Sequence, residues 1–370
     1  MLGEFCLLAF LQSSIFLAWN PIANSALKAF GPQWTPSTLA WQINLATISS
    51  PFVQYPVWYF LKKFGLSRTI RWLAVLPLVI SSLLSSLPVL ISVQNEVYQW
   101  LTYGSYLFTG VTGVVFFSCV TRFSATWFGP RQTATSTGMA CTFANLGGIL
   151  PSIVGPIWVT DPYKNPEVPV QEIQQEIYNY MLLYLVLSLI LFGIFWMHFP
   201  ENQNFEQPDL NESVRTDIIQ ILKSGNVILV ILVASLGSIP HIWGSTLLTV
   251  TLSRLEIYQN FVGAITSISL ISSTIFTFTL TRCADLYFGQ SLKNLIMGLM
   301  PVHALTMIVL AVCILIGTPQ ANYQCKYIFF EIFMLQKYIR DSIPELHQQH
   351  YPTIDQWDNH SFLGSFPSRF

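Results

Sequence analysis

Charged side chains are scarce in this sequence. Only 9% of its 370 residues are Asp, Glu, Lys or Arg, whereas soluble proteins carry about 25%. The net charge is -1, so the chain lacks the basic surface that nucleic-acid binding requires. Hydrophobic residues make up 52% of the sequence and gather in long runs. The composition therefore predicts an integral, multi-pass membrane protein in contact with the lipid bilayer, and no nucleic-acid partner.

Residue patterns for catalysis are also absent. The sequence contains no nucleophile elbow, no phosphate-binding glycine loop and no metal-ligand helix. Most of its six cysteines lie in or beside apolar runs, without the spacing of a disulfide framework or a zinc site. We therefore predict that the chain is not an enzyme, and that it has no cofactor and no metal site.

Long apolar runs define the expected architecture. A membrane-spanning helix needs about 20 mostly apolar residues, and nine runs meet this requirement. They lie near residues 5–28, 37–61, 72–94, 98–121, 132–160, 178–199, 225–252, 259–281 and 293–317. A signal peptide is the alternative for the first run, but only Glu4 precedes it where a basic segment is needed, so we expect a retained helix.

Four regions follow from the spacing of these runs. Residues 1–199 are predicted to form a six-helix bundle, and the charged residues 200–223 a central loop. Residues 224–335 should form a partial second bundle, and residues 336–370 a polar tail. Alternate loops hold ten and three Lys or Arg residues. Since cytoplasmic loops hold the excess, this asymmetry predicts a cytoplasmic N-terminus and a cytoplasmic central loop.

Polar residues interrupt the first apolar run between Gln12 and Ser25. Hydrocarbon offers no hydrogen-bond partner for amides and hydroxyls. If the run is one helix, Gln12, Phe16, Asn20 and Asn24 share a face, because they are four residues apart, with Trp19 and Pro21 beside them. We expect this face to line a polar cavity between helices.

Two basic loops occupy matching places after the second helix of each predicted bundle. The first holds Lys62, Lys63, Gly65 and Arg68, and the second holds Arg282, Asp285 and Gly289. Charges around a turn glycine suit a gate between helices in a carrier built from repeated halves. A positive-inside charge bias with a turn glycine is the alternative for either loop alone. Arg131, in the loop after the fourth run, is grouped with these candidate gating residues.

The fifth run carries a seam of small residues at helical spacing: Gly138, Cys141, Asn145, Gly148, Ser152 and Gly155. Small residues let helices approach closely in lipid, so close packing is the favoured interpretation. Gly147, Gly148 and nearby prolines should also make this helix bendable. Asn145 is the seam member that we select as a candidate cavity residue.

His241 follows Pro240 within the seventh run, and Trp243 is close by. An ionisable residue inside a spanning helix is a candidate functional residue, and histidine could carry or sense a proton. A neutral histidine that bonds a carbonyl freed by the proline is an equal alternative.

These residues resemble those of solute carrier family 49 in the major facilitator superfamily. The resemblance rests on Trp19, Pro21, Asn24, Ser25 and Ala29-Phe-Gly31, and on a second set that begins in the loop after the fourth run and continues into the fifth. That set comprises Ala125-Thr-Trp-Phe128, Arg131, Ala134-Thr135, Gly147-Gly148 and Val154-Gly-Pro156. The resemblance implies twelve helices in two pseudo-symmetric halves that move a small organic solute by alternating access. Members of the family are linked to haem, choline, ethanolamine and proton-coupled export of pyridoxine from lysosomes.

The resemblance also implies roles and a location. Trp19, Asn20 and Asn24 would line the central cavity, Asp285 would be the latch carboxylate of the second half, and the lysosomal membrane would be the location, with the plasma membrane as an alternative. Lys62 stands where the first-half latch usually has an aspartate, and Asn20 where a close relative has glycine. Of the twelve helices, we expect the tenth to be missing except for its last turns around Phe329-Phe-Glu331, and the eleventh and twelfth to be absent. We expect a secondary transporter with a complete first half and about nine helices, whose partner is a small solute and in which coupling to protons is open. The alternative is a non-transporting form that binds or regulates a full-length carrier.

Overall fold

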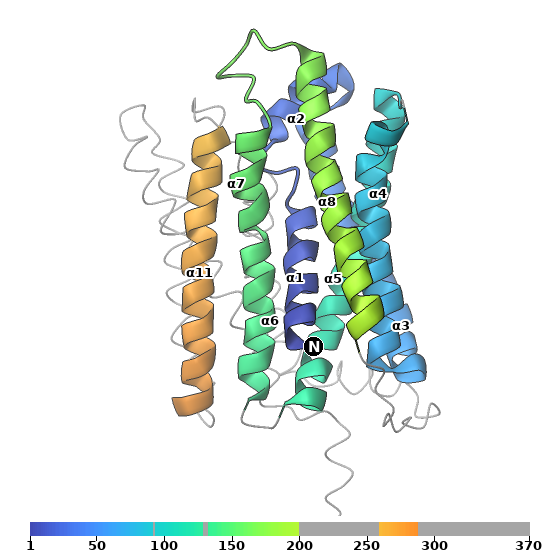
Figure 1. Cartoon of the computed structure of the whole chain (residues 1–370), viewed down its shortest axis with the longest axis vertical. Coiled ribbons are helices and arrows are strands. Elements are labelled where there is room, and N and C mark those ends of the chain that lie inside the picture. The colour runs from blue at the N-terminus through green and yellow to red at the C-terminus, as the bar shows by residue number, and fades with distance from the viewer. Residues whose placement is uncertain (92, 129–131, 200–258, 288–370) are drawn as a thin grey trace, which may run out of the picture.

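The computed structural model describes residues 1–91, 93–128, 132–199 and 259–287, which form helices joined by short connections. Figure 1 shows the long helices standing side by side as an upright bundle. The helices are α1 (Leu2–Phe16), α2 (Ala23–Ala29), α3 (Pro36–Ile70), α4 (Leu76–Leu90), α5 (Asn95–Trp127), α6 (Thr133–Gly147), α7 (Ile149–Trp158), α8 (Val170–His198) and α11 (Gln259–Tyr287). These ranges contain no strand, so the predicted all-α class is confirmed for them.

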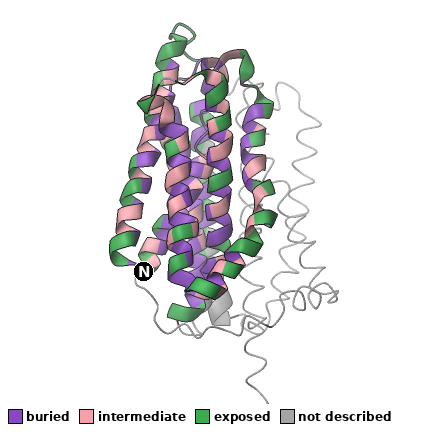
Figure 2. Cartoon of the chain, turned by 90° about the vertical axis from the view of Figure 1, so that its right-hand side faces the viewer, coloured by how far each residue is buried: buried purple, intermediate pink, exposed green. Residues whose placement is uncertain are grey.

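Four helical stretches of the described chain are long and apolar enough to span a membrane. They are Pro36–Leu90, Asn95–Trp127, Thr135–Trp158 and Val170–His198, and Leu2–Phe16 is a shorter apolar helix. Figure 2 shows exposed residues on the outward sides of the helices and buried ones in the middle of the bundle. The outward positions include large apolar side chains such as Phe52, Ile157 and Met197. Such apolar exteriors suit contact with lipid, which is as apolar as they are.

The stretch Pro36–Leu90 crosses the bundle twice. Gln42 and Gln54 of α3 bond Thr102 and Ser118 of α5, so α3 and α5 run in the same direction. The partners of α5 in η2 (Arg71–Val75) and α4 come in the opposite order. Thr112 bonds Ala74 of η2, whereas Ser105, which is earlier in α5, bonds Ser85, which is later in the chain than Ala74. The chain must therefore reverse between these two crossings.

That reversal lies at Gly65, whose φ of 79° and ψ of 173° are open to glycine alone at low cost. Helical structure continues on both sides of it, through Lys62 and Arg68. The prediction of a loop across residues 62–71 is therefore wrong in extent, because the turn is confined to the glycine. Lys and Arg are good helix formers, so these charges do not end the helices.

The first predicted helix is also different in the structure. The run 5–28 is not one helix: α1 ends at Phe16 and α2 begins at Ala23. In between, the N–H groups of Ala18 and Asn20 bond carbonyls only three residues back, at 3.2 Å each. Pro21 has no N–H to donate and disfavours helical geometry at the residue before it, which explains the interruption.

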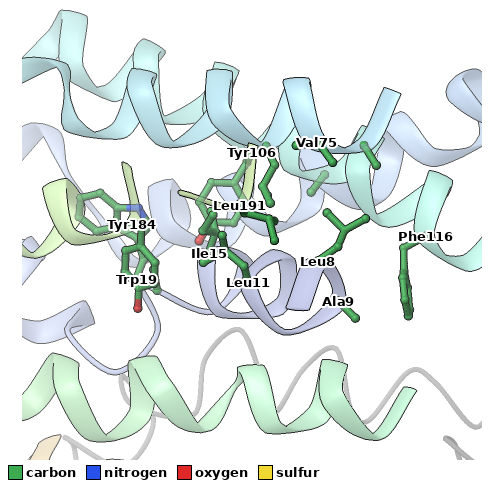
Figure 3. Close-up of a cluster of buried hydrophobic side chains, with 14 of the residues drawn as sticks. Leu8, Ala9, Leu11, Ile15, Trp19, Val75, Tyr106, Phe116, Tyr184 and Leu191 are labelled. Atoms are coloured by element: carbon green, nitrogen blue, oxygen red, sulfur yellow. The ribbon is translucent and has the colours of Figure 1, made fainter. Parts of the chain in front are cut away.

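α1 lies in the middle of the described bundle. Figure 3 shows its Leu8, Leu11 and Ile15 among apolar side chains from neighbouring helices, including Phe116 of α5 and Leu191 of α8. The ring of Phe5 stacks on Phe116, with centroids 5.2 Å apart. In lipid such packing stabilises through van der Waals contact rather than through removal from water.

α6 and α7 divide the fifth predicted run at Gly148, as its glycines predicted. α11 packs along both of these helices (Figure 1). Close packing through the seam is confirmed at two members. A Cβ on Gly148 would be 2.9 Å from Leu17, and one on Gly155 would be 3.1 Å from Ile22.

α8 begins at Val170, earlier than the predicted residue 178. Glu172 and Glu176, expected in the preceding loop, therefore lie in its first two turns. Acidic residues stabilise the N-terminus of a helix, so these charges favour the extra turns.

Candidate functional site

The interruption of α1 leaves polar side chains inside the bundle. Asn24, on α2, is buried at 5% exposure. Asn20 lies in the turn before it, and its Oδ1 is buried without a hydrogen-bond partner among the described residues. A buried, unpaired acceptor costs about 1–3 kcal/mol unless something binds it. The turn therefore presents an acceptor that the described protein does not satisfy.

Gln12 and Phe16 connect this region to α5. A Cβ on Gly113 of α5 would lie 3.0 Å from Nε2 of Gln12, so the glycine makes room for the amide. The Tyr106 hydroxyl of α5 donates to the Phe16 carbonyl at 3.1 Å. This carbonyl is at the end of α1, where backbone acceptors lack intrahelical partners. The Tyr106 hydroxyl thus caps the C-terminus of α1.

Trp19 lies in an aromatic cluster. Its ring centroid is 5.2 Å from that of Trp34, 6.1 Å from Tyr98 and 6.3 Å from Phe30. Only 3% of Trp19 is exposed. Aromatic pairs in this distance range attract one another beyond simple burial. The structure therefore places Trp19 in packing between α1, α2 and α5, whereas the Asn20 Oδ1 has no hydrogen-bond partner within the described part of the chain.

Asn145 is buried on α6, beside the contact that holds α6 against α1. Ser14 of α1 donates from Oγ to the Gly147 carbonyl at 2.7 Å. A Cβ on Gly147 would overlap the carbonyl oxygen of Phe10. The two backbones therefore touch here, and this contact fixes Asn145 relative to the interruption of α1.

The candidate gating residues of the first half surround Gly65. The Lys62 ammonium lies over the Trp58 ring, 4.1 Å from its centroid. Lys63 donates to the Tyr59 hydroxyl at 3.2 Å, and Arg68 is exposed. The two lysines therefore contact aromatic side chains of their own helix.

Of the second-half gating residues, Arg282 and Asp285 lie within α11 rather than in a loop. The prediction of a loop from Arg282 to Gly289 is wrong for these two positions, because α11 continues to Tyr287. Arg131, His241, Trp243 and Gly289 lie outside the described residues.

Comparison with known proteins bears on this arrangement. No protein-family model matches the sequence. In structure, the chain is similar to the xylose transporter XylE of E. coli in a partially occluded inward open conformation. The TM-score is 0.63 at 13% identity, over 94% of this chain and 86% of that one. A bacterial homologue of the human lysosomal transporter Spinster gives a TM-score of 0.59 at 9% identity, over 92% of this chain and 73% of that one. This chain has the major facilitator superfamily fold.

The curated proteins to which this chain is similar are named as solute carriers. The solute carrier family 49 member 4 homolog of Xenopus tropicalis is 25% identical over 293 residues, which cover 76% of this chain and 62% of that protein. The Xenopus laevis homolog is 25% identical over 240 residues, covering 62% of this chain and 50% of that protein. The resemblance to solute carrier family 49 is thereby confirmed. The chain spans less than two thirds of the length of these relatives.

Three contacts of the site were not predicted. Tyr106 caps the C-terminus of α1, and Ser14 bonds α1 to α6. The Arg71 guanidinium donates to the Phe199 carbonyl at the end of α8. Hydroxyls in apolar runs were a visible signal, but their partners come from distant parts of the chain. Among the described residues, no group of three His, Cys, Asp or Glu side chains could hold a metal ion.

Proposed function

We propose that this chain moves a small organic solute across a membrane by alternating access. Its major facilitator fold and its solute-carrier relatives support a carrier. The observation that carries the proposal is the interruption of α1, with the unpaired Oδ1 of Asn20 inside the bundle. Carriers bind solutes at interrupted helices, where side chains and freed backbone groups meet in a protein interior.

In this proposal, Asn20 accepts a hydrogen bond from a hydroxyl, amine or amide of the solute. Asn24 and Asn145 lie on the neighbouring α2 and α6 and supply further polar contacts, while Trp19 keeps the turn in place through its aromatic partners. His241 and Trp243 are proposed to face this site from the second half. Proton coupling through His241 would make transport depend on pH, and replacement by glutamine would remove that dependence.

The lysosomal membrane is the location that best fits this proposal. One similar curated protein is a solute carrier family 49 member 4 homolog, and one structural neighbour is a homologue of a lysosomal transporter. Gating is assigned to the Gly65 reversal with its basic residues Lys62, Lys63 and Arg68, together with Arg131, and to Arg282, Asp285 and Gly289 of the second half.

Uptake into proteoliposomes tests the proposal. The purified chain is reconstituted with an imposed pH gradient, and uptake of radiolabelled pyridoxine, choline, ethanolamine, D-xylose and uridine is compared with protein-free liposomes. We expect uptake above this control for at least one probe. Uptake of none would contradict the carrier proposal, and co-purification with a complete carrier would then favour the alternative of a regulatory partner.

Asn20→Leu is the site variant for the transported probe. Loss of one buried hydrogen bond of about 1–2 kcal/mol should weaken apparent affinity by roughly five- to thirtyfold. Asn179→Leu is the matched control, because Asn179 is exposed on α8. Equal affinities of the two variants would remove Asn20 from the proposed site.

A further inference from the structure

A network of buried hydrogen bonds joins the two halves at one end of the bundle. This end, called the α2 end, holds α2 and the loop 159–169 between α7 and α8, and is at the top of Figure 1. Gln259, the first residue of α11, is fully buried there. Its contacts are with residues that precede the central segment, so they tie α11 to the first half.

Gln259 is held at three of its polar atoms. Its backbone N–H donates to Oδ2 of Asp161 at 3.0 Å, and its Nε2 donates to the Val159 carbonyl at 3.0 Å. Its Oε1 accepts from Oγ of Ser25, on α2, at 3.1 Å, and Ser25 shares this hydroxyl hydrogen with the Thr160 carbonyl at 2.9 Å. One residue of the second half thus contacts α2 and the end of α7 together.

Asp161 is the charged member of this network, and only 4% of it is exposed. While Oδ2 accepts from Gln259, Oδ1 accepts from the backbone N–H of Tyr163 at 3.0 Å. Hydrogen bonds to a carboxylate are stronger than those between neutral groups. The loop itself is anchored by Glu176 of α8, which accepts from the N–H and the hydroxyl of Thr160 at 2.8 and 3.0 Å.

Below the network, α11 touches α7 without such bonds. A Cβ on Gly263 would overlap the Ser152 carbonyl oxygen and lie 2.9 Å from Pro156. Gly263 is four residues, about 6 Å, from Gln259 along the helix. No hydrogen bond joins the described residues of α7 and α11 at this contact, so a tilt of α11 on α7 would have to break the bonds of Gln259 at the α2 end.

We infer that Asp161, Ser25 and Gln259 form a latch that closes the α2 end of the transport path and must break when the halves part there. Asp161 is a gating residue in this scheme, since it acts on Gln259 rather than on the solute. The inference rests on the proposed carrier function, because only a carrier needs the α2 end to open.

Distances between spin labels test the latch without any solute. Nitroxides are attached through a keto amino acid introduced at Gln171 of α8 and Asn260 of α11, which are both exposed, so the native cysteines remain. Double electron–electron resonance on the purified chain in nanodiscs then gives the ratio of long to short distances. In the native sequence the short distance should dominate.

Asp161→Asn should raise the long-to-short ratio on the order of tenfold. The amide keeps one acceptor oxygen for two backbone donors and loses the charge. Ser25→Ala should raise the ratio less, since Gln259 keeps its other two bonds and the lost bond from Ser25 to the Thr160 carbonyl lies within the first half. Glu167→Gln is the matched control, because Glu167 is an exposed acid of the same loop, and it should leave the ratio unchanged.

The latch is refuted if Asp161→Asn and Ser25→Ala give the same ratio as Glu167→Gln while all three elute as native protein. Should Asp161→Asn fail to fold, Ser25→Ala decides alone. Failure of the carrier proposal is distinguishable, since it appears as absent uptake with label distances that still respond to these variants.

Discussion

The contact between α1 and α6 gives the sharpest test of the packing. Replacement of Gly147 by alanine places a methyl group on the carbonyl oxygen of Phe10. This neighbour is backbone and cannot rotate away, so the helices must separate. Separation also lengthens the buried hydrogen bond from Ser14 to the Gly147 carbonyl, now 2.7 Å.

Two contributions set the expected loss of stability. Overpacking in a well-packed interior costs about 1–3 kcal/mol. A weakened interhelical hydrogen bond adds about 0.6 kcal/mol, the mean for such bonds in membrane proteins. These two contributions sum to about 2–4 kcal/mol. Alanine is the better helix former by about 1 kcal/mol, so Gly147→Ala should destabilise the chain by about 1–3 kcal/mol.

Unfolding in mixed dodecyl maltoside and sodium dodecyl sulfate, followed by tryptophan fluorescence, measures this loss. Gly193→Ala is the matched control, because a Cβ on Gly193, also within a helix, meets no atom within 4 Å. The control should be neutral or slightly stabilised. Equal stability of Gly147→Ala and Gly193→Ala would refute the close approach of α1 and α6.

Three further variants test single contacts. Arg71→Gln removes the charge-assisted bond to the Phe199 carbonyl. Hydrogen exchange of the amides at the end of α8, followed by mass spectrometry, should then accelerate roughly tenfold. An unchanged exchange rate would contradict a stabilising role of this bond. Ser105→Val removes the hydroxyl bonds to Ser81 and Ser85 of α4, of 2.9 and 2.7 Å. It should lower the free energy of unfolding by about 1–2 kcal/mol in the same fluorescence assay. An unchanged free energy of unfolding would contradict a stabilising role of these bonds. Lys62→Ala loses the contact with the Trp58 ring and should cost less than about 1 kcal/mol there, and a larger loss would show that Lys62 has another partner.

Among the described residues, the long apolar helices could be predicted from the sequence, because hydrophobic length is a direct consequence of membrane thickness. The interruption of α1 could not. Pro21 lies at the interruption, but α3 contains Pro51 and Pro56 and α4 contains Pro88 without ending there. Spanning helices tolerate proline when neighbours satisfy the freed groups. The helix ends before Pro21, and hydropathy does not distinguish this proline from the three inside α3 and α4.

Hydropathy also does not predict where helices end outside the apolar core. Lys62, Lys63 and Glu176 are polar, so hydropathy alone predicts loops at these positions, yet each lies in a helix. A polar residue beyond the membrane loses nothing by being helical, since water reaches it in either state. Only Gly65, with its positive φ, marks the true turn.

The stretch from Gln12 to Ser25 shows how an interruption changes a prediction made from helical spacing. On an unbroken helix, Gln12, Asn20 and Asn24 would share one face. The interruption after Phe16 ends that register, so residues beyond it meet different surroundings. Ser25 turns to Gln259 and becomes part of the proposed latch, while Asn20 stays unpaired beside it. A solute bound at Asn20 would therefore sit five residues from the latch, on the same short segment. The Ala23 N–H donates to the Asn20 carbonyl at 3.4 Å, and Ser25 follows two residues later in α2. We therefore expect a displacement of Asn20 by a bound solute to be transmitted to Ser25, which would couple solute binding to opening of the α2 end.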